Sequence, residues 1–215
     1  MSAPEVGRHP AWFGAVMGTG ATSVVLLTQS EVWGLAWARW LSVAFLLLAT
    51  AFALLLWPRY MRRLADRAAL RTEMSDPGHG AMLATFPAGL LILAVAWGRV
   101  GPEVVSASVS LWIDVVLLVV GAVIAVAVGV AWASSISAGT QDLASVNGGW
   151  LIPPVMNLLV PLALIPVIAR FPEQAPWLLV VGFAFVGIGT VLFLAIFGLL
   201  VTRLALRPPP PPQLA

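Results

Sequence analysis

The chain contains no cysteine, no lysine and only two histidines, and charged residues make up 9% of its 215 residues. The absence of cysteine excludes disulfides, thiolate nucleophiles and cysteine-ligated metal sites. His9 and His79 flank apolar segments and have no companion at metal-ligand spacing, so we expect no metal site. Soluble proteins average about 25% charged residues. A water-soluble domain of this length could not cover its surface with so few charges.

Long apolar runs take the place of the missing charges. Hydrophobic residues make up 60% of the chain, and its charge-free stretches approach or exceed the roughly 20 residues that a helix needs to cross the hydrocarbon core of a bilayer. These runs lack the alternation of a membrane barrel, and backbone groups in lipid must be paired internally. The sequence therefore predicts an all-α integral membrane protein with six transmembrane helices. They are expected at residues 11–29, 38–57, 81–99, 108–132, 150–169 and 177–202.

The six helices are predicted to form three helical hairpins within a single transmembrane domain, residues 1–205. The hairpins cover residues 11–57, 81–132 and 150–202, and their first helices begin about 70 residues apart. The turns of the second and third hairpins repeat a short phrase, Arg99-Val-Gly-Pro-Glu and Arg170-Phe-Pro-Glu. Residues 206–215 contain a run of prolines and are expected to form a disordered tail.

The arginines are distributed unevenly along the chain. Five of them lie in the segment between the second and third helices: Arg59, Arg62, Arg63, Arg67 and Arg71. The positive-inside rule places this segment, and by alternation both termini, in the cytoplasm. The protein is thus predicted to be a multi-pass protein of the cell's inner (plasma) membrane. Acidic residues interrupt the arginine cluster and Tyr60 is the single aromatic residue within it, so the expected partner is the lipid bilayer and not nucleic acid.

The first helix of each predicted hairpin carries glycines or prolines that disfavour a regular helix, whereas the second helix is uniformly apolar. Proline removes a backbone hydrogen bond, and a carbonyl freed in lipid must be satisfied by protein or by water in a cavity. We therefore predict that the odd-numbered helices are inner and broken, and that the even-numbered helices form an outer, lipid-facing layer. On that outer layer Gly121 should tolerate leucine. For any single glycine, ordinary close packing between helices is an equally good explanation.

Asp114, at the start of the fourth predicted helix, has two interpretations. Carboxylates within membrane spans are costly and often functional, for instance as proton carriers. A carboxylate near a helix N-terminus at the interface is also favourable electrostatically, and we favour this interfacial interpretation. Asp114 alone makes no catalytic constellation, so no enzymatic activity is predicted. The sequence has no phosphate loop or dinucleotide fingerprint, so no cofactor is expected either.

Three stretches resemble the tellurite-resistance/dicarboxylate transporter family, which includes fungal malate permeases, sulfite efflux pumps and the slow anion channels of plant guard cells. They are HPAWFGAVMGTGATSVVL at 9–26, HGAMLATFPAGL at 79–90 and NGGWLIPPVMNLLVP at 147–161. The resemblance implies helical hairpins around a central pore, with odd-numbered helices lining it. The pore-lining candidates on this chain are Gly18, Thr19, Gly20, Phe86, Pro87, Pro153, Pro154 and Asn157.

The resemblance implies a membrane permease or channel for small anions, such as a C4-dicarboxylate or sulfite. Arg99 and Arg170, at the outer ends of their helices, are candidates for attracting anions to the pore mouth. Each has a nearby glutamate in the sequence, and ordinary snorkelling of a helix-end arginine is the stronger interpretation. No basic residue lies deep in a predicted span, which favours weak binding and fast passage.

The chain departs from the family in length. The family has ten helices and this sequence six, and the family's gating phenylalanine on the ninth helix has no counterpart here. The six-helix chain is therefore expected to be a truncated product, half of a split transporter, or a reduced relative that closes by forming a homo-oligomer. The alternative function is that of a non-transporting or incomplete membrane subunit that a partner completes.

Overall fold

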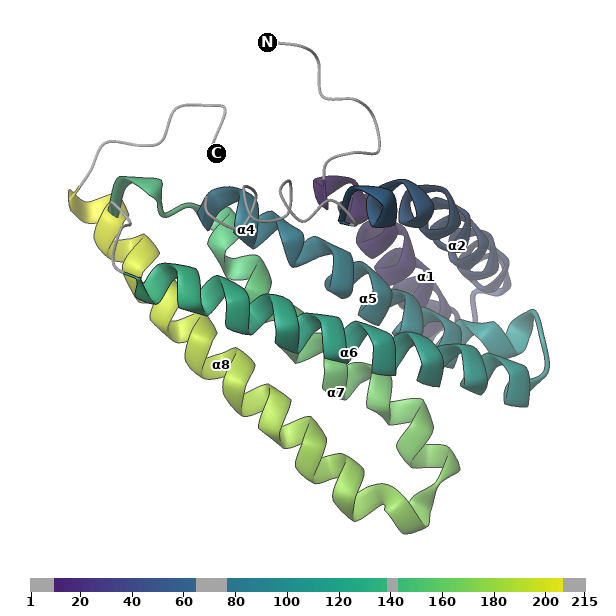
Figure 1. Cartoon of the computed structure of the whole chain (residues 1–215). Helices are drawn as coiled ribbons and strands as arrows, with labels where there is room; N and C mark the ends of the chain where they lie inside the picture. Colours follow the sequence, from purple (N-terminus) through teal and green to yellow (C-terminus); the bar gives the residue numbers. More distant parts are fainter. Residues whose placement is uncertain (1–9, 65–76, 139–142, 207–215) are drawn as a thin grey trace.

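The computed structural model describes residues 10–64, 77–138 and 143–206, and every regular element in these ranges is a helix (Figure 1). Six helical segments are long and apolar enough to cross a membrane, as predicted. Five of them are continuous helices: α1 (Phe13–Trp33), α2 (Ala36–Leu64), α6 (Ala107–Ser137), α7 (Ile152–Arg170) and α8 (Ala175–Leu206). The third span is divided into α4 (Pro77–Leu83) and α5 (Thr85–Val100). The predicted tail lies outside the described residues apart from its first residue.

Short 3₁₀ turns join the spans at the ends of the bundle. They are η1 (Pro10–Trp12), η2 (Gly101–Glu103), η3 (Leu143–Ser145), η4 (Gly148–Leu151) and η5 (Pro172–Gln174). The phrase repeated in the sequence forms the same structure twice, because η2 and η5 both carry proline in their first positions and a glutamate in their first turn. The α1–α2 turn is different: α1 ends at Gly34, whose φ of 64° is a left-handed conformation that favours glycine.

The helix α5 lies in the middle of the bundle, with α1 on one side and α7 on the other, while α2 and α6 also pack against it (Figure 1). The outermost helix, α8, packs mainly against α7. In the third span 89% of the central apolar stretch is buried, against 50% in the fifth, 22% in the fourth and 17% in the sixth. The first and second spans are equally exposed, at 28% buried. In the second and third hairpins, therefore, the first helix is the more buried one; in the first hairpin it is not.

The interruption expected near Pro87 is present. The chain leaves the helix at Ala84, and α5 then starts so that Pro87 lies in its first turn, where a missing N–H costs little. The Thr85 hydroxyl donates to the carbonyl oxygen of Pro10 at 2.6 Å, which ties the start of α5 to the turn before α1.

The prediction that α1 and α7 are also broken is wrong. Gly18 and Gly20 lie within one uninterrupted helix, and glycine inside a helix costs only about 1 kcal/mol relative to alanine. In α7, Pro153 and Pro154 occupy the first turn, where proline is tolerated. Two further prolines lie inside α7 without ending it.

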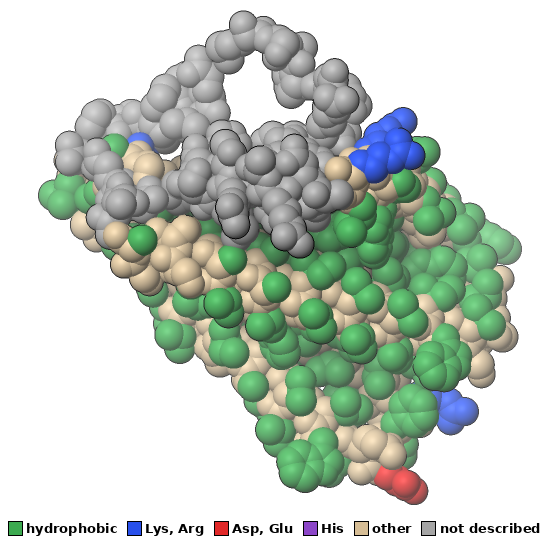
Figure 2. All heavy atoms as spheres, in the orientation of Figure 1, with side chains coloured by type: hydrophobic (Ala, Val, Ile, Leu, Met, Phe, Trp, Pro, Cys, Tyr) green, Lys and Arg blue, Asp and Glu red, His purple; other side chains and the backbone are tan. Residues whose placement is uncertain are grey.

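The face of the bundle drawn in Figure 2 is apolar over its middle, and the charged side chains visible there lie toward the ends of the bundle. Five large tryptophans are exposed close to the ends of their helices where the α1–α2 turn, η2 and η5 lie: Trp33, Trp37, Trp40, Trp112 and Trp177. Exposed tryptophans are typical of the level of the lipid headgroups. This end of the bundle therefore lies at one membrane surface; we refer to it as the tryptophan end.

Candidate functional site

The helix α1 has one packed face, on which Gly20 lies. The buried residues of α1 are Phe13, Val16, Gly20, Ser23 and Leu27. A Cβ added at Gly20 would lie 2.8 Å from Cγ2 of Ile92 on α5, so a side chain at this position would collide with the central helix. Gly20 is therefore a contact point between helices.

The opposite face of α1 is open. A Cβ added at Gly14 or Gly18 would meet no atom within 4 Å. Thr22 follows one turn after Gly18, and its hydroxyl donates to the Gly18 carbonyl oxygen at 2.8 Å. The half-buried Thr19 likewise donates to the Ala15 carbonyl oxygen at 2.6 Å. The three predicted lining residues of α1 are thus separated: Gly18 lies on the open face, Gly20 on the packed face, and Thr19 between them.

Phe86 lies in an aromatic cluster between α1, α2 and α5. Its ring centroid is 4.8 Å from that of Phe13, 5.2 Å from that of Tyr60 and 5.5 Å from that of Trp57. Phe86 is only 2% exposed, and Pro87 beside it is also buried. These contacts hold the first hairpin against α5, while a role for Phe86 in lining a pore stays a prediction.

Pro153, Pro154 and Asn157 lie together at the start of α7, and all three are buried. The Asn157 side-chain amide donates to the Pro153 carbonyl oxygen at 2.9 Å. Gly189 of α8 lies close to Pro154, since a Cβ at Gly189 would be 3.1 Å from the Pro154 carbonyl oxygen. This part of α7 is a packed junction with α8, and its role in lining a pore is likewise a prediction.

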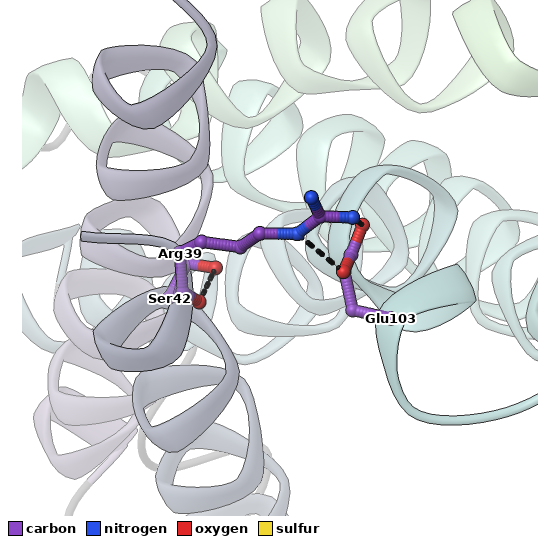
Figure 3. Close-up of polar contacts among 3 residues, drawn as sticks. All are labelled: Arg39, Ser42 and Glu103. Atoms are coloured by element: carbon purple, nitrogen blue, oxygen red, sulfur yellow. Dashed lines mark hydrogen bonds and ion pairs between the residues drawn. The ribbon is translucent and has the colours of Figure 1, made fainter. Parts of the chain in front are cut away.

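Two ion pairs cross between the first and second hairpins at the tryptophan end. Arg39 of α2 donates to both carboxylate oxygens of Glu103 at 2.7 Å, the two-pronged geometry in which arginine binds carboxylates most firmly (Figure 3). Arg99 of α5 pairs with Glu31 of α1 at 3.0 Å. The glutamate that pairs with Arg99 is therefore Glu31 and not Glu103, which is closer in the sequence but is bound by Arg39.

The structure brings Arg99 and Arg170 to one cavity. This cavity, of about 350 Å³, lies at the tryptophan end between α5, α6 and α7, and both arginines line it. Arg170 forms no ion pair within the described residues, whereas Arg99 forms an ion pair with Glu31. The two candidates for attracting anions thus lie at a common site.

Asp114 lies directly behind this cavity and is completely buried. Neither carboxylate oxygen has a hydrogen-bond partner among the described residues. A Cβ at Gly98 would lie 2.5 Å from Asp114 Oδ2 and 2.6 Å from Cγ of Pro166, so the carboxylate is wedged between α5 and α7. Asp114 therefore does not face water, because α6 turns this residue toward α5 and α7; whether it lies at the depth of the membrane interface stays a prediction.

No three side chains among His, Cys, Asp and Glu gather into a metal-binding group in residues 10–64, 77–138 and 143–206. The described helices offer apolar packing, hydroxyls that donate to backbone carbonyls of their own or a neighbouring element, and arginines toward the helix ends.

Residues 8–215 match the SLAC1 family of voltage-dependent anion channels. The chain belongs to this family. It is accordingly a multi-pass membrane protein of a family of anion channels and transporters, which are not enzymes. The resemblance to the tellurite-resistance/dicarboxylate transporters is confirmed at the level of the family. No curated protein and no solved structure matches the chain.

In this SLAC1-family chain α6 has a packed face that the sequence-based prediction of an outer, lipid-facing helix did not include. Gly121 was expected to face lipid, but a Cβ there would lie 3.0 Å from two atoms of Leu91 on α5. Gly121 is buried on the same face as Asp114 and Ala125. A signal was available, since these small or polar residues recur at intervals of seven and four in an otherwise bulky apolar helix.

Proposed function

We propose that the chain forms a permease or channel for a small anion, such as a C4-dicarboxylate, sulfite or a simple inorganic anion. In this proposal α1, α5 and α7 form the inner layer of helices. The observation that carries this proposal is the family match over residues 8–215. The greater burial of α5 and α7 relative to α6 and α8 supports an inner and an outer layer.

The open face of α1 is the proposed lining on this chain. Gly14 and Gly18 leave room beside the helix, and the Thr22 hydroxyl lies next to them. Because the Thr22 hydroxyl already donates to the Gly18 carbonyl oxygen, the described part of this face would offer a passing anion space and only weak binding. The described arginines lie toward helix ends, so they favour entry of anions over tight binding within the membrane.

A second candidate function is that of an incomplete subunit. The same open face of α1 carries no packing partner among the described residues, and helix faces with small residues are typical sites of helix association in membranes. In this alternative a second copy of the chain, or another membrane subunit, covers the face and completes the pore.

One preparation can separate these two functions. Purified protein is reconstituted into liposomes, and the flux of malate, sulfite and chloride is measured on the same sample whose oligomeric mass is determined in mild detergent. Flux confined to a higher-order species supports the incomplete-subunit function of the single chain. Robust flux from a demonstrably monomeric sample excludes it, and no flux of any anion from any species contradicts the transport function.

We also propose that both termini and the 58–80 segment face the cytoplasm, which puts the tryptophan end outside. The chain lacks cysteine, so single cysteines report its orientation directly. Ala107→Cys at the start of α6 should be labelled by a membrane-impermeant reagent in intact cells, and Leu206→Cys at the end of α8 should be labelled only after lysis. The reverse pattern would invert the topology.

A further inference from the structure

The cavity that Arg99 and Arg170 line has an apolar wall. Leu111 of α6 and Ile165 of α7 contribute to it, and Ser110 supplies a hydroxyl that is already used, because it donates to the Trp97 carbonyl oxygen. The site thus combines two guanidinium groups with hydrocarbon side chains. A small hydrated anion would gain no binding free energy from contact with these hydrocarbon side chains.

Two further cavities adjoin the first by sharing its lining residues. Arg170 and Leu111 also line a cavity of about 250 Å³ between α6 and α7, beside Trp112. Ile165 also lines a cavity of about 400 Å³ between α7 and α8, whose lining side chains are all apolar. On α7 this third cavity extends from Leu158 to Ile168, which is about 15 Å along a helix axis. Apolar grooves therefore lead from the arginines toward the middle of the membrane.

The three cavities meet around Arg170 and Ile165, and we refer to this place as the junction. Its charge is positive and partly uncompensated. Arg170 has no ion-pair partner in the part of the chain that the structure describes, although Glu173 follows it by three residues. Arg99 is shared with Glu31. Asp114 does not line the cavity, because Gly98 and Pro166 stand in front of it. The accessible surface therefore favours an anionic ligand.

The junction also lies at the depth of lipid headgroups. Trp112, which lines the second cavity, is 70% exposed, and Trp177 near the start of α8 is 77% exposed. Exposed tryptophans occupy the interface between headgroups and acyl chains. The two arginines are thus at the level where a bilayer presents its phosphates, and the apolar cavities lie below that level.

We propose that this junction is a binding site for one anionic phospholipid. The phosphate binds Arg170 and Arg99, since guanidinium groups bind phosphate oxygens in a two-pronged manner. The acyl chains occupy the apolar cavities on either side of α7. The site is separate from the proposed anion path, because it lies between α5, α6 and α7 and not on the open face of α1.

The test uses the full chain in a neutral detergent. Phosphatidylglycerol, phosphatidylcholine with the same acyl chains, and inorganic phosphate are titrated separately, while native mass spectrometry counts retained lipids and thermal unfolding reports stabilisation. Phosphatidylglycerol should bind with one retained molecule and raise the unfolding temperature more than phosphatidylcholine. Arg170→Gln should weaken this binding at least about fivefold, as expected for the loss of a charge-assisted phosphate contact.

The matched control is Arg59→Gln, which removes a helix-end arginine near the other end of the bundle and should leave the affinity unchanged. A second variant, Ala169→Phe, fills the cavity while retaining both arginines and should also weaken binding. Equal binding of the two lipids, equal losses in Arg170→Gln and Arg59→Gln, or full stabilisation by inorganic phosphate alone would each overturn the proposal.

Discussion

The two faces of α1 use the same kind of residue for opposite purposes. Gly20 lies on the packed face, where α5 approaches so closely that even a Cβ would collide with Ile92. Gly18 lies two residues earlier on the open face, where an added Cβ would meet no atom within 4 Å. The role of a glycine in a membrane helix therefore depends on the face on which it lies: Gly20 permits close helix contact and Gly18 leaves open space. The two substitutions should consequently have different effects.

The largest effect is expected from filling the packed glycines. Gly20→Leu and Gly121→Leu each insert a bulky side chain where the neighbouring helix is within 3 Å of a Cβ. Overpacking typically costs about 1–3 kcal/mol and occasionally more. Because both sites face the central helix, we expect the upper end of this range and a severe loss of folded, monodisperse protein in size-exclusion chromatography.

The control for these variants is Gly187→Leu on α8, where a Cβ would meet no atom within 4 Å. Gly187→Leu should give the yield of the unchanged protein. If all three variants folded equally well, the distinction between packed and open glycines would be wrong.

A smaller effect of opposite sign is expected at the packed face of α6. Asp114→Asn keeps the shape of the side chain and removes a carboxylate that is buried without a hydrogen-bond partner. Asparagine would also lack a hydrogen-bond partner, but a buried group without a partner costs more when it is charged, so the gain comes from the lost charge. The variant should therefore unfold at a higher temperature in detergent. A lower unfolding temperature would mean that the carboxylate has a stabilising partner.

Filling the open face of α1 should change transport and not folding. Gly18→Leu should be produced and purified like the unchanged protein, yet reduce anion flux about tenfold or more, because conduction needs an unobstructed path. Gly187→Leu is again the matched control, since it adds the same side chain at an open, lipid-facing position. Normal flux in Gly18→Leu would remove the open face of α1 from the proposed path.

The smallest effect is expected from the ion pair in Figure 3. The Arg39 and Glu103 side chains are 58% and 25% exposed, and exposed ion pairs contribute about 0–1 kcal/mol. Arg39→Gln should therefore lower the unfolding temperature slightly, and Arg39→Gln with Glu103→Gln should do no more. A loss comparable to that of Gly20→Leu would show that this pair determines how the first two hairpins dock.

The spans and the interruption at Pro87 could be predicted because each depends on local composition. The buried face of α6 could be read only from the spacing of its few small and polar residues, because its apolar residues surround the whole helix. The positions of Asp114 and Gly121 followed from the approach of α5, a contact between separate helices. The pairing of Arg39 with Glu103 joins residues 64 apart, so the nearest glutamate in sequence was a poor guide to the partner of Arg99.

The central position of α5 also has a consequence for the order in which the protein can assemble during synthesis. Two of its neighbours, α1 and α2, precede it in the chain, but α6 and α7 follow it, and α7 begins only at Ile152. Until that segment has emerged, one side of α5 must be covered by lipid or by the insertion machinery. Contact of α5 with lipid during this interval costs little free energy, because no charged residue lies between Gly80 and Gly98. A ribosome that stalls between α6 and α7 would leave an inserted but unfinished bundle, whose exposed central helix is a target for membrane proteases.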